Sequence, residues 1–123
     1  MRALVVDDSR AMRTLLGRML RDMGYEVQEA SNGLQGLERL KQTGKPDLAL
    51  VDWNMPEMDG LEFVRALRSE QAYDGLVVMM VTTETETEQV AKALNAGANE
   101  YVMKPFTPEI IQEKLRMLGM AGP

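Results

Sequence analysis

Two residue types with distinctive chemistry are missing from this sequence, which contains no cysteine and no histidine. Without cysteine the chain can form no disulfide, no thiolate metal site and no cysteine nucleophile. Without histidine it lacks the commonest general base, and it cannot itself carry a phosphohistidine. Any chemistry of this chain must therefore use other side chains.

Positive charge and long apolar runs are also scarce. The net charge of -5 disfavours nucleic acid as a direct partner, because neutralising its phosphates requires a basic patch. No stretch approaches the ~20 apolar residues that span a bilayer. The N-terminal apolar run at 3–6 is too short for the hydrophobic region of a signal peptide, and acids follow it at once. We therefore expect a cytoplasmic protein that binds neither nucleic acid nor membrane.

Five short apolar runs recur along the 123 residues, and each is followed by a helical pattern. This alternation predicts a single α/β domain with a parallel sheet and right-handed crossovers. Three runs are nearly continuous in apolar residues, as in strands covered on both faces, whereas the second alternates and is expected at an edge. The predicted strands are Ala3–Val6, Tyr25–Ala30, Asp47–Val51, Leu76–Val81 and Asn99–Met103.

Capping residues set the bounds of five predicted helices. The first lies between Ser9 and Gly24, the second ends before Gly44, the third opens with a capping box of Asp59 and Glu62, the fourth ends at Gly97, and the fifth lies between Thr107 and Gly119. The residues expected to face the core from the fifth helix are Ile110, Ile111, Leu115 and Leu118.

Two segments fall outside this pattern. Residues 82–88 alternate threonine and glutamate, a period that also suits a strand. We interpret them as a loop entering the fourth helix, because the helix dipole favours glutamates in a first turn. Residues 120–123 follow the last helix, and we expect them to form a frayed tail.

Polar side chains stand at the carboxyl ends of four predicted strands. Asp7 and Asp8 follow the first, Asp52 the third and Thr82 the fourth, while Lys104 closes the fifth. Each has an ordinary explanation when taken alone, as a turn acid, a helix cap or a surface lysine. In an open parallel sheet, however, ligands bind beyond these ends. Three converging carboxylates repel one another unless a cation offsets their charge, and Mg²⁺ suits such oxygen ligands.

Together these residues resemble a response-regulator receiver domain. The resemblance covers residues 4 to about 118 in order and spacing, and it is closest to the stand-alone chemotaxis (CheY-like) type. It implies a flavodoxin-like (βα)5 fold, a doubly wound five-stranded parallel sheet with strand order 2-1-3-4-5. The motifs that carry it are Asp7-Asp8, residues 52–56 (Asp-Trp-Asn-Met-Pro), Met58-Asp59-Gly60, Thr82 and residues 101–106 (Tyr-Val-Met-Lys-Pro-Phe).

The resemblance implies a role for each residue of a Mg²⁺ and phosphoryl site. Asp52 is the expected phosphoacceptor, and Lys104 pairs with a phosphoryl oxygen. Asp8 and Asp52 are direct metal ligands, Asp7 acts through water, and the backbone carbonyl of Asn54 completes the protein ligands. Mn²⁺ is expected to substitute for Mg²⁺. Phosphoryl transfer needs mainly positioning and charge stabilisation, so it can proceed without histidine.

Further roles follow from the same resemblance. The Thr82 hydroxyl hydrogen-bonds another phosphoryl oxygen, and Tyr101 is the switch residue whose ring turns inward when Thr82 is drawn to the phosphate. Asn54 and Glu84 occupy positions that modulate hydrolysis of the acyl phosphate. The Lys104–Pro105 peptide bond is expected in cis.

The implied function is phosphorylation-activated signalling in a two-component system of the chemotaxis or motility type. We expect residues 1–123 to form one receiver domain with no output domain, and we therefore expect a partner protein to dock on the face made by helix 4, strand 5 and helix 5. The phosphoryl donor is a sensor histidine kinase or a phosphotransfer protein. The chain promotes its own phosphorylation and dephosphorylation and is not a conventional enzyme. We expect a monomer that can dimerise when phosphorylated.

The start of the fourth helix departs from the chemotaxis type. Glu86 and Thr87 stand where such proteins usually carry lysines, which leaves open whether the target is the flagellar motor. Three other functions remain as alternatives. They are a flavin- or nucleotide-binding protein, disfavoured by two aspartates in the first loop, a magnesium phosphatase, disfavoured by Asn54 and the lack of a cap, and an interaction module that has lost phosphorylation.

Overall fold

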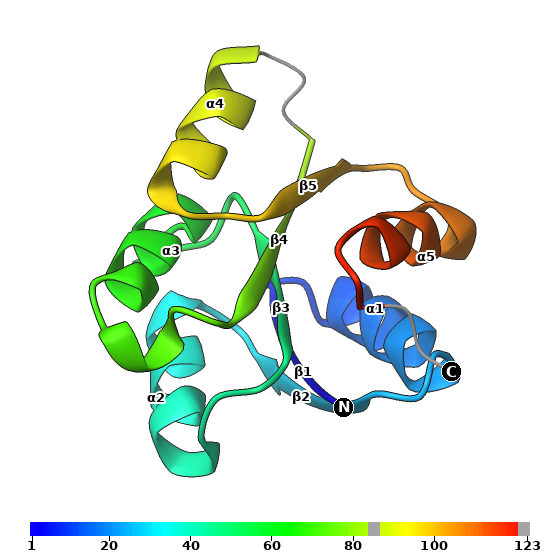
Figure 1. Ribbon diagram of the computed structural model, residues 1–123, viewed down its shortest axis with the longest axis horizontal. Coiled ribbons are helices and arrows are strands. Elements are labelled where there is room, and N and C mark those ends of the chain that lie inside the picture. The colour runs from blue at the N-terminus through cyan, green and yellow to red at the C-terminus, as the bar shows by residue number, and fades with distance from the viewer. Residues whose placement is uncertain (84–86, 121–123) are drawn as a thin grey trace.

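The computed structural model describes residues 1–83 and 87–120 of the chain. Across these residues, five parallel strands form one sheet in the order β2-β1-β3-β4-β5 (Figure 1). The predicted strand order and the edge position of the second strand are therefore confirmed. The observed bounds differ from the predicted ones by one residue. The strands are β1 (Arg2–Val6), β2 (Glu26–Ala30), β3 (Leu48–Asp52), β4 (Val77–Thr82) and β5 (Glu100–Met103).

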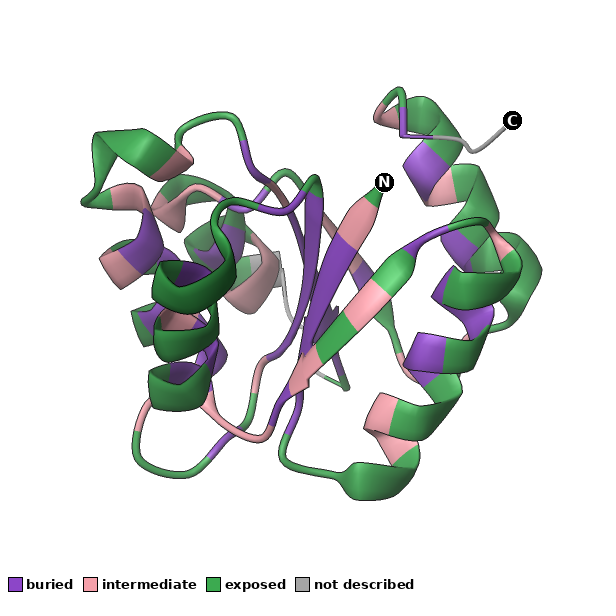
Figure 2. Cartoon of the chain, turned by 90° about the horizontal axis from the view of Figure 1, so that it is seen from below, coloured by how far each residue is buried: buried purple, intermediate pink, exposed green. Residues whose placement is uncertain are grey.

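Helices cover both faces of this sheet, as a doubly wound fold requires. Figure 2 shows the sheet between two helical layers. One layer consists of α1 (Arg10–Asp22) and α5 (Pro108–Met117). The other consists of α2 (Gly33–Thr43), α3 (Gly60–Arg68) and α4 (Thr87–Ala96), with the short 3-10 helix η1 (Gln71–Tyr73) leading into β4.

The two faces of the sheet pack into separate apolar cores. Alternation along the strands divides their side chains, so Leu4 and Val6 join the core under α2, α3 and α4, while Ala3 and Val5 join the core under α1 and α5. All five residues of β3 are buried. Full burial of each large aliphatic side chain contributes about 1.5–3 kcal/mol. The central strands are thus a rigid base for the loops at their carboxyl ends.

The helix starts follow the predicted capping residues. The Ser9 side chain accepts a hydrogen bond from the Met12 N–H, and Asp59 and Glu62 form the reciprocal capping box of α3. The Thr107 side chain caps α5 by accepting a hydrogen bond from the Ile110 N–H. In the segment 82–88, Thr82 ends β4 and α4 begins at residue 87, while 84–86 lie outside the described residues.

Two expectations near the C-terminus are wrong. Ile110 is 43% exposed, because Ile111 and Leu115, one helical turn apart, occupy the core side of α5 and turn the neighbouring Ile110 outward. Met120 is not frayed. Its N–H donates to the Leu115 carbonyl at 2.7 Å, and its own carbonyl accepts a buried hydrogen bond from the Tyr25 hydroxyl at 2.8 Å. The rest of the expected tail, residues 121–123, lies outside the described residues.

Within the described part of the chain, none of the helices has the length and apolar character that crossing a membrane requires.

Candidate functional site

The sheet brings the predicted strand ends to one edge. Asp52 is the last residue of β3 and pairs with Val81 of β4. The Lys104 N–H donates to the Thr82 carbonyl at 2.8 Å, which ties the residue after β5 to the end of β4. The Asp7 N–H donates to the carbonyl of Ala30 at the end of β2. Side chains that are far apart in the sequence therefore meet at the carboxyl edge of the sheet.

Three carboxylates converge at this edge, as the sequence predicted. One oxygen from each of Asp7, Asp8 and Asp52 lies within 4.8 Å of the other two. Asp7 and Asp52 are only 1% and 6% exposed, whereas Asp8 is exposed. The Lys104 Nζ lies 3.2 Å from Asp52 Oδ1 and 3.9 Å from Asp7 Oδ2. One ammonium group thus faces two buried carboxylates.

Burial makes the negative charge of this cluster costly. It is the largest cause that raises the pKa of Asp52 to about 6, with a further increase from the charge of Asp7 and an opposing decrease from Lys104. Burial also raises the pKa of Asp7, against the hydrogen bond from the Ser9 N–H and the charge of Lys104. The lysine therefore offsets only part of the cost of holding these charges together.

The hydrogen bonding of Asp7 indicates what else the cluster can hold. Its Oδ1 accepts from the Ser9 N–H at 2.8 Å. Its Oδ2 is buried and receives no hydrogen bond from any residue that the structure describes. A buried acceptor without a donor is costly, and here it lies among other carboxylate oxygens. A hard divalent cation with oxygen ligands would offset both costs, so the cluster fits Mg²⁺.

The loop after β3 folds back over Asp52 because residue 60 is glycine. A Cβ at Gly60 would lie 2.3 Å from the Asp52 carbonyl oxygen, closer than any side chain allows. The Gly60 N–H donates to the Trp53 carbonyl at 2.9 Å, while the Trp53 N–H donates to the Val81 carbonyl at 3.0 Å. Asn54 is exposed within this loop, two residues beyond Asp52. The close approach fixes the backbone beside the central carboxylate.

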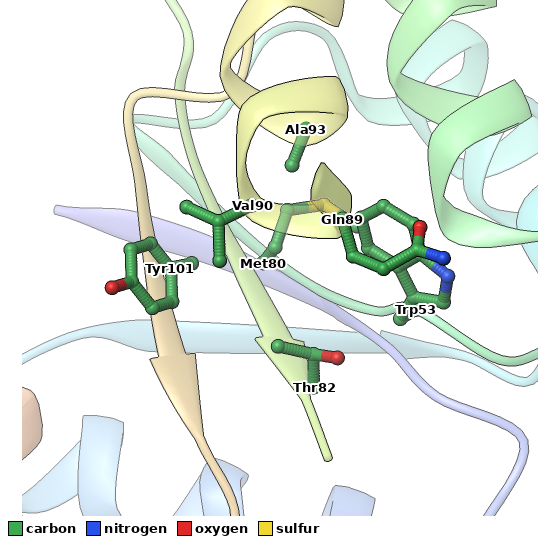
Figure 3. A pocket seen from close by; sticks show the side chains of 7 residues that line it. All are labelled: Trp53, Met80, Thr82, Gln89, Val90, Ala93 and Tyr101. Carbon is green, nitrogen blue, oxygen red and sulfur yellow. The ribbon is translucent and has the colours of Figure 1, made fainter. Parts of the chain in front are cut away.

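A narrow pocket lies next to the carboxylate cluster, between β4, β5 and α4 (Figure 3). Thr82 is 3% exposed at its lower end. Tyr101 is half-buried, and its hydroxyl points away from the other labelled side chains. The Lys114 Nζ lies 5.0 Å from the centre of the Tyr101 ring, a distance typical of a cation–π contact. The pocket is lined by Trp53, Met80, Thr82, Gln89, Val90, Ala93 and Tyr101.

The structure describes some of the remaining predicted site residues and not others. The Lys104–Pro105 peptide bond is cis, the conformation that the resemblance implied. Glu84 lies outside the described residues. The sequence reasoning missed Arg13 and Glu29, which contact each other beside Asp7. The signal that could have found Arg13 is its four-residue spacing from Gly17 and Arg21, which places all three on one helix face.

Known proteins share this chain's sequence and fold over nearly its whole length. The family model described as the response regulator receiver domain matches residues 3–116. Chemotaxis protein CheY1 of Helicobacter pylori is 42% identical over 119 residues, which cover 96% of each protein. The chemotaxis protein CheY homolog of Campylobacter jejuni is 43% identical over 94% of this chain and 89% of the relative.

Solved structures of chemotaxis response regulators share the fold of this chain. The chemotaxis response regulator CheY4 of Vibrio cholerae superposes with a TM-score of 0.88 at 37% identity, over 95% of this chain and 97% of that one. The sheet order, the carboxylates at its carboxyl edge and the sequence similarity all point the same way. The chain belongs to the response regulator receiver domain family and is of the CheY type.

Proposed function

We propose that this protein accepts a phosphoryl group on Asp52 in a Mg²⁺-dependent reaction and signals through the resulting change in its surface. The observation that carries the proposal is the buried Asp52 carboxylate, with the Lys104 ammonium at 3.2 Å and two further carboxylates within 4.8 Å. This arrangement suits a reaction in which charge builds up and must be stabilised at a fixed position.

In the proposed site, Asp8 and Asp52 bind the cation directly, Asp7 binds it through water, and the backbone carbonyl of Asn54 is a further ligand. Mg²⁺, or Mn²⁺ in its place, would neutralise the carboxylates and the phosphoryl oxygens that join them. The Oδ2 of Asp7, which receives no hydrogen bond from the described residues, supports this assignment, because it gives a coordinated water a buried acceptor.

The side chains that the chemistry requires are all present in this chain, and the cation, the phosphoryl donor and water complete the reaction. An oxygen of the ionised Asp52 attacks the phosphorus, a new P–O bond forms, and the bond to the donor breaks, with its electron pair leaving on the donor. Lys104 then exchanges its contact with Asp52 for a phosphoryl oxygen, and the Thr82 hydroxyl donates to another. Water attack on the acyl phosphate returns Asp52 and inorganic phosphate, at a rate modulated by Asn54 and Glu84.

Phosphorylation changes the protein surface through movements of Thr82 and Tyr101. Movement of Thr82 toward the phosphoryl group makes room in the pocket that both residues line, and the Tyr101 ring turns inward. The face formed by α4, β5 and α5 changes with it and binds a downstream protein.

The donor of the phosphoryl group is a histidine kinase or phosphotransfer protein. The protein acts in the cytoplasm, and the pathway is chemotaxis or motility signalling.

Intact-mass spectrometry tests this function directly. Wild type incubated with acetyl phosphate and Mg²⁺ should gain the mass of one phosphoryl group, and chelation of the metal should prevent the gain. Asp52→Ala should show no gain, whereas Asp22→Ala, which changes an exposed aspartate at the end of α1, should behave as wild type. An equal gain on Asp52→Ala would place the phosphoacceptor elsewhere.

A further inference from the structure

Arg13 connects the turn that carries Asp7 and Asp8 to the edge strand β2. Its Nη1 donates to the backbone carbonyl of Asp7 at 2.7 Å. Its Nε lies 3.4 Å from Glu29 Oε1, in a pair whose side chains are 17% and 35% exposed. The sequence assigned no role to β2, yet a β2 side chain contacts the residue that holds the acidic turn.

This contact fixes the orientation of one peptide unit. The Asp7 carbonyl and the Asp8 N–H belong to the same planar group, so the bond from Arg13 sets the direction in which the chain enters Asp8. Asp7 is also held through its N–H, which donates to Ala30, and through Oδ1, which accepts from Ser9. Among these contacts, the bond from Arg13 is the one made to the peptide that joins the two aspartates.

One face of helix α1 carries both arginines that contact Glu29. Arg13, Gly17 and Arg21 follow one another at four-residue spacing and therefore share a helix face. A Cβ at Gly17 would lie 3.8 Å from Glu29 Oε2 and 3.3 Å from Arg21 Nη1. The Glu29 carboxylate lies against this face, with Oε1 3.4 Å from Arg13 Nε and Oε2 4.0 Å from Arg21 Nη2.

We propose that Arg13 is a positioning residue for divalent-cation binding, with Glu29 anchoring its guanidinium and balancing its charge. The inference rests on the proposed function, since the cation concerned is the Mg²⁺ of that site. Arg13 acts on Asp8 through the Asp7–Asp8 peptide and touches neither the metal nor the phosphoryl group. Loss of an outer partner of this kind typically weakens metal affinity 10–100-fold.

The sign of the effect separates positioning from simple electrostatics. The Arg13 guanidinium lies beside Asp7 and would repel a dication bound there, so charge alone predicts that Arg13→Gln binds Mg²⁺ more tightly. Positioning predicts the opposite, a Kd raised about tenfold. Arg21→Gln is the matched control, because it removes the same charge from the same helix and also loses a contact with Glu29, but Arg21 is not bonded to Asp7.

Isothermal titration of Mg²⁺ into the metal-free proteins, well below their melting temperatures, measures this difference. We expect Arg13→Gln to bind about tenfold more weakly than Arg21→Gln, which should stay near wild type. Arg13→Lys keeps the charge but cannot span Asp7 and Glu29 with two fixed donors, and it should also bind more weakly than wild type. If Arg13→Gln does not fold, the comparison is made with Arg13→Lys instead. The Asp8 amide resonance of the metal-free variants should shift in Arg13→Lys and not in Arg21→Gln.

The possible outcomes separate a failure of this inference from a failure of the proposed function on which it rests. If wild type binds Mg²⁺ and the Arg13 variants bind as tightly as Arg21→Gln or more tightly, Arg13 and Glu29 form only a structural ion pair and the inference is wrong. If wild type shows no Mg²⁺ binding, the metal site and the inference both fail. Weaker binding in the Arg13 variants alone, together with the Asp8 amide shift, supports the positioning role.

Discussion

Replacing Asp52 with asparagine removes a charge from the buried carboxylate cluster, and we expect this change to stabilise the metal-free protein above neutral pH. Asp52 is 6% exposed and shares the cluster with Asp7 and Asp8. Asparagine has nearly the same shape but no charge, so the packing around it is retained. Asparagine cannot serve as the proposed phosphoacceptor, so the variant tests the site's electrostatics alone.

The pKa of Asp52 gives the size and the pH range of the effect. The pKa rises from an ordinary 3.8 to about 6 in the folded protein, chiefly through burial. The folded state therefore takes up a proton before the unfolded state does as the pH falls. Above pH 6 the ionised carboxylate destabilises the fold by about 3 kcal/mol at most, at 1.36 kcal/mol per pKa unit. This penalty disappears as the pH falls from about 6 to 3.8.

Urea unfolding in the presence of a chelator, followed by circular dichroism at pH 8 and pH 4, measures the difference between wild type and Asp52→Asn. At pH 8 the variant should be more stable by up to about 3 kcal/mol, a figure that already includes the attraction of Lys104, because that attraction contributes to the pKa of Asp52. At pH 4 the two proteins should be nearly equal. A variant that is less stable than wild type at pH 8, or equally stabilised at both pH values, would refute the reasoning.

Two further predictions concern neighbouring residues. Lys104→Ala should retain thermal stabilisation by Mg²⁺, about 2.7 kcal/mol when Mg²⁺ is at 100 times its Kd, yet lose most phosphorylation by acetyl phosphate, and equal losses of both would contradict separate roles. Gly60→Ala should destabilise the protein by more than the ~1 kcal/mol typical of point mutants, because its Cβ would lie 2.3 Å from the Asp52 carbonyl. A Gly60→Ala variant as stable as wild type in urea unfolding would contradict that close approach.

The parts of the fold that could be predicted from the sequence depend on local signals. Helix starts at Ser9, Asp59 and Thr107 follow from capping residues, each of which acts within three positions. Convergence of Asp7 and Asp52 followed from parallel pairing, which places all strand ends at one edge. These inferences needed the order of elements along the chain and no knowledge of side-chain packing.

The parts that could not be predicted depend on contacts between distant segments. The bond from the Tyr25 hydroxyl to Met120 spans 95 positions, and no local pattern marks either partner. Periodicity alone placed Ile110 and Ile111 on the same face, although only one of two adjacent helical residues can face the core fully. The position of Lys114 over Tyr101 likewise depends on how α5 packs beside β5.

We propose above all that Asp7, Asp8 and Asp52 hold one divalent cation, with Asp52 also serving as the phosphoacceptor. Crystals grown with Mn²⁺ in place of Mg²⁺ test it most directly, because the anomalous signal of the metal locates the ion without any assumption about its ligands. We predict a peak among the three carboxylates, within direct ligand distance of Asp8 and Asp52, and its loss in Asp8→Ala. A peak elsewhere on the molecule, or none at this edge of the sheet at saturating Mn²⁺, would contradict the account.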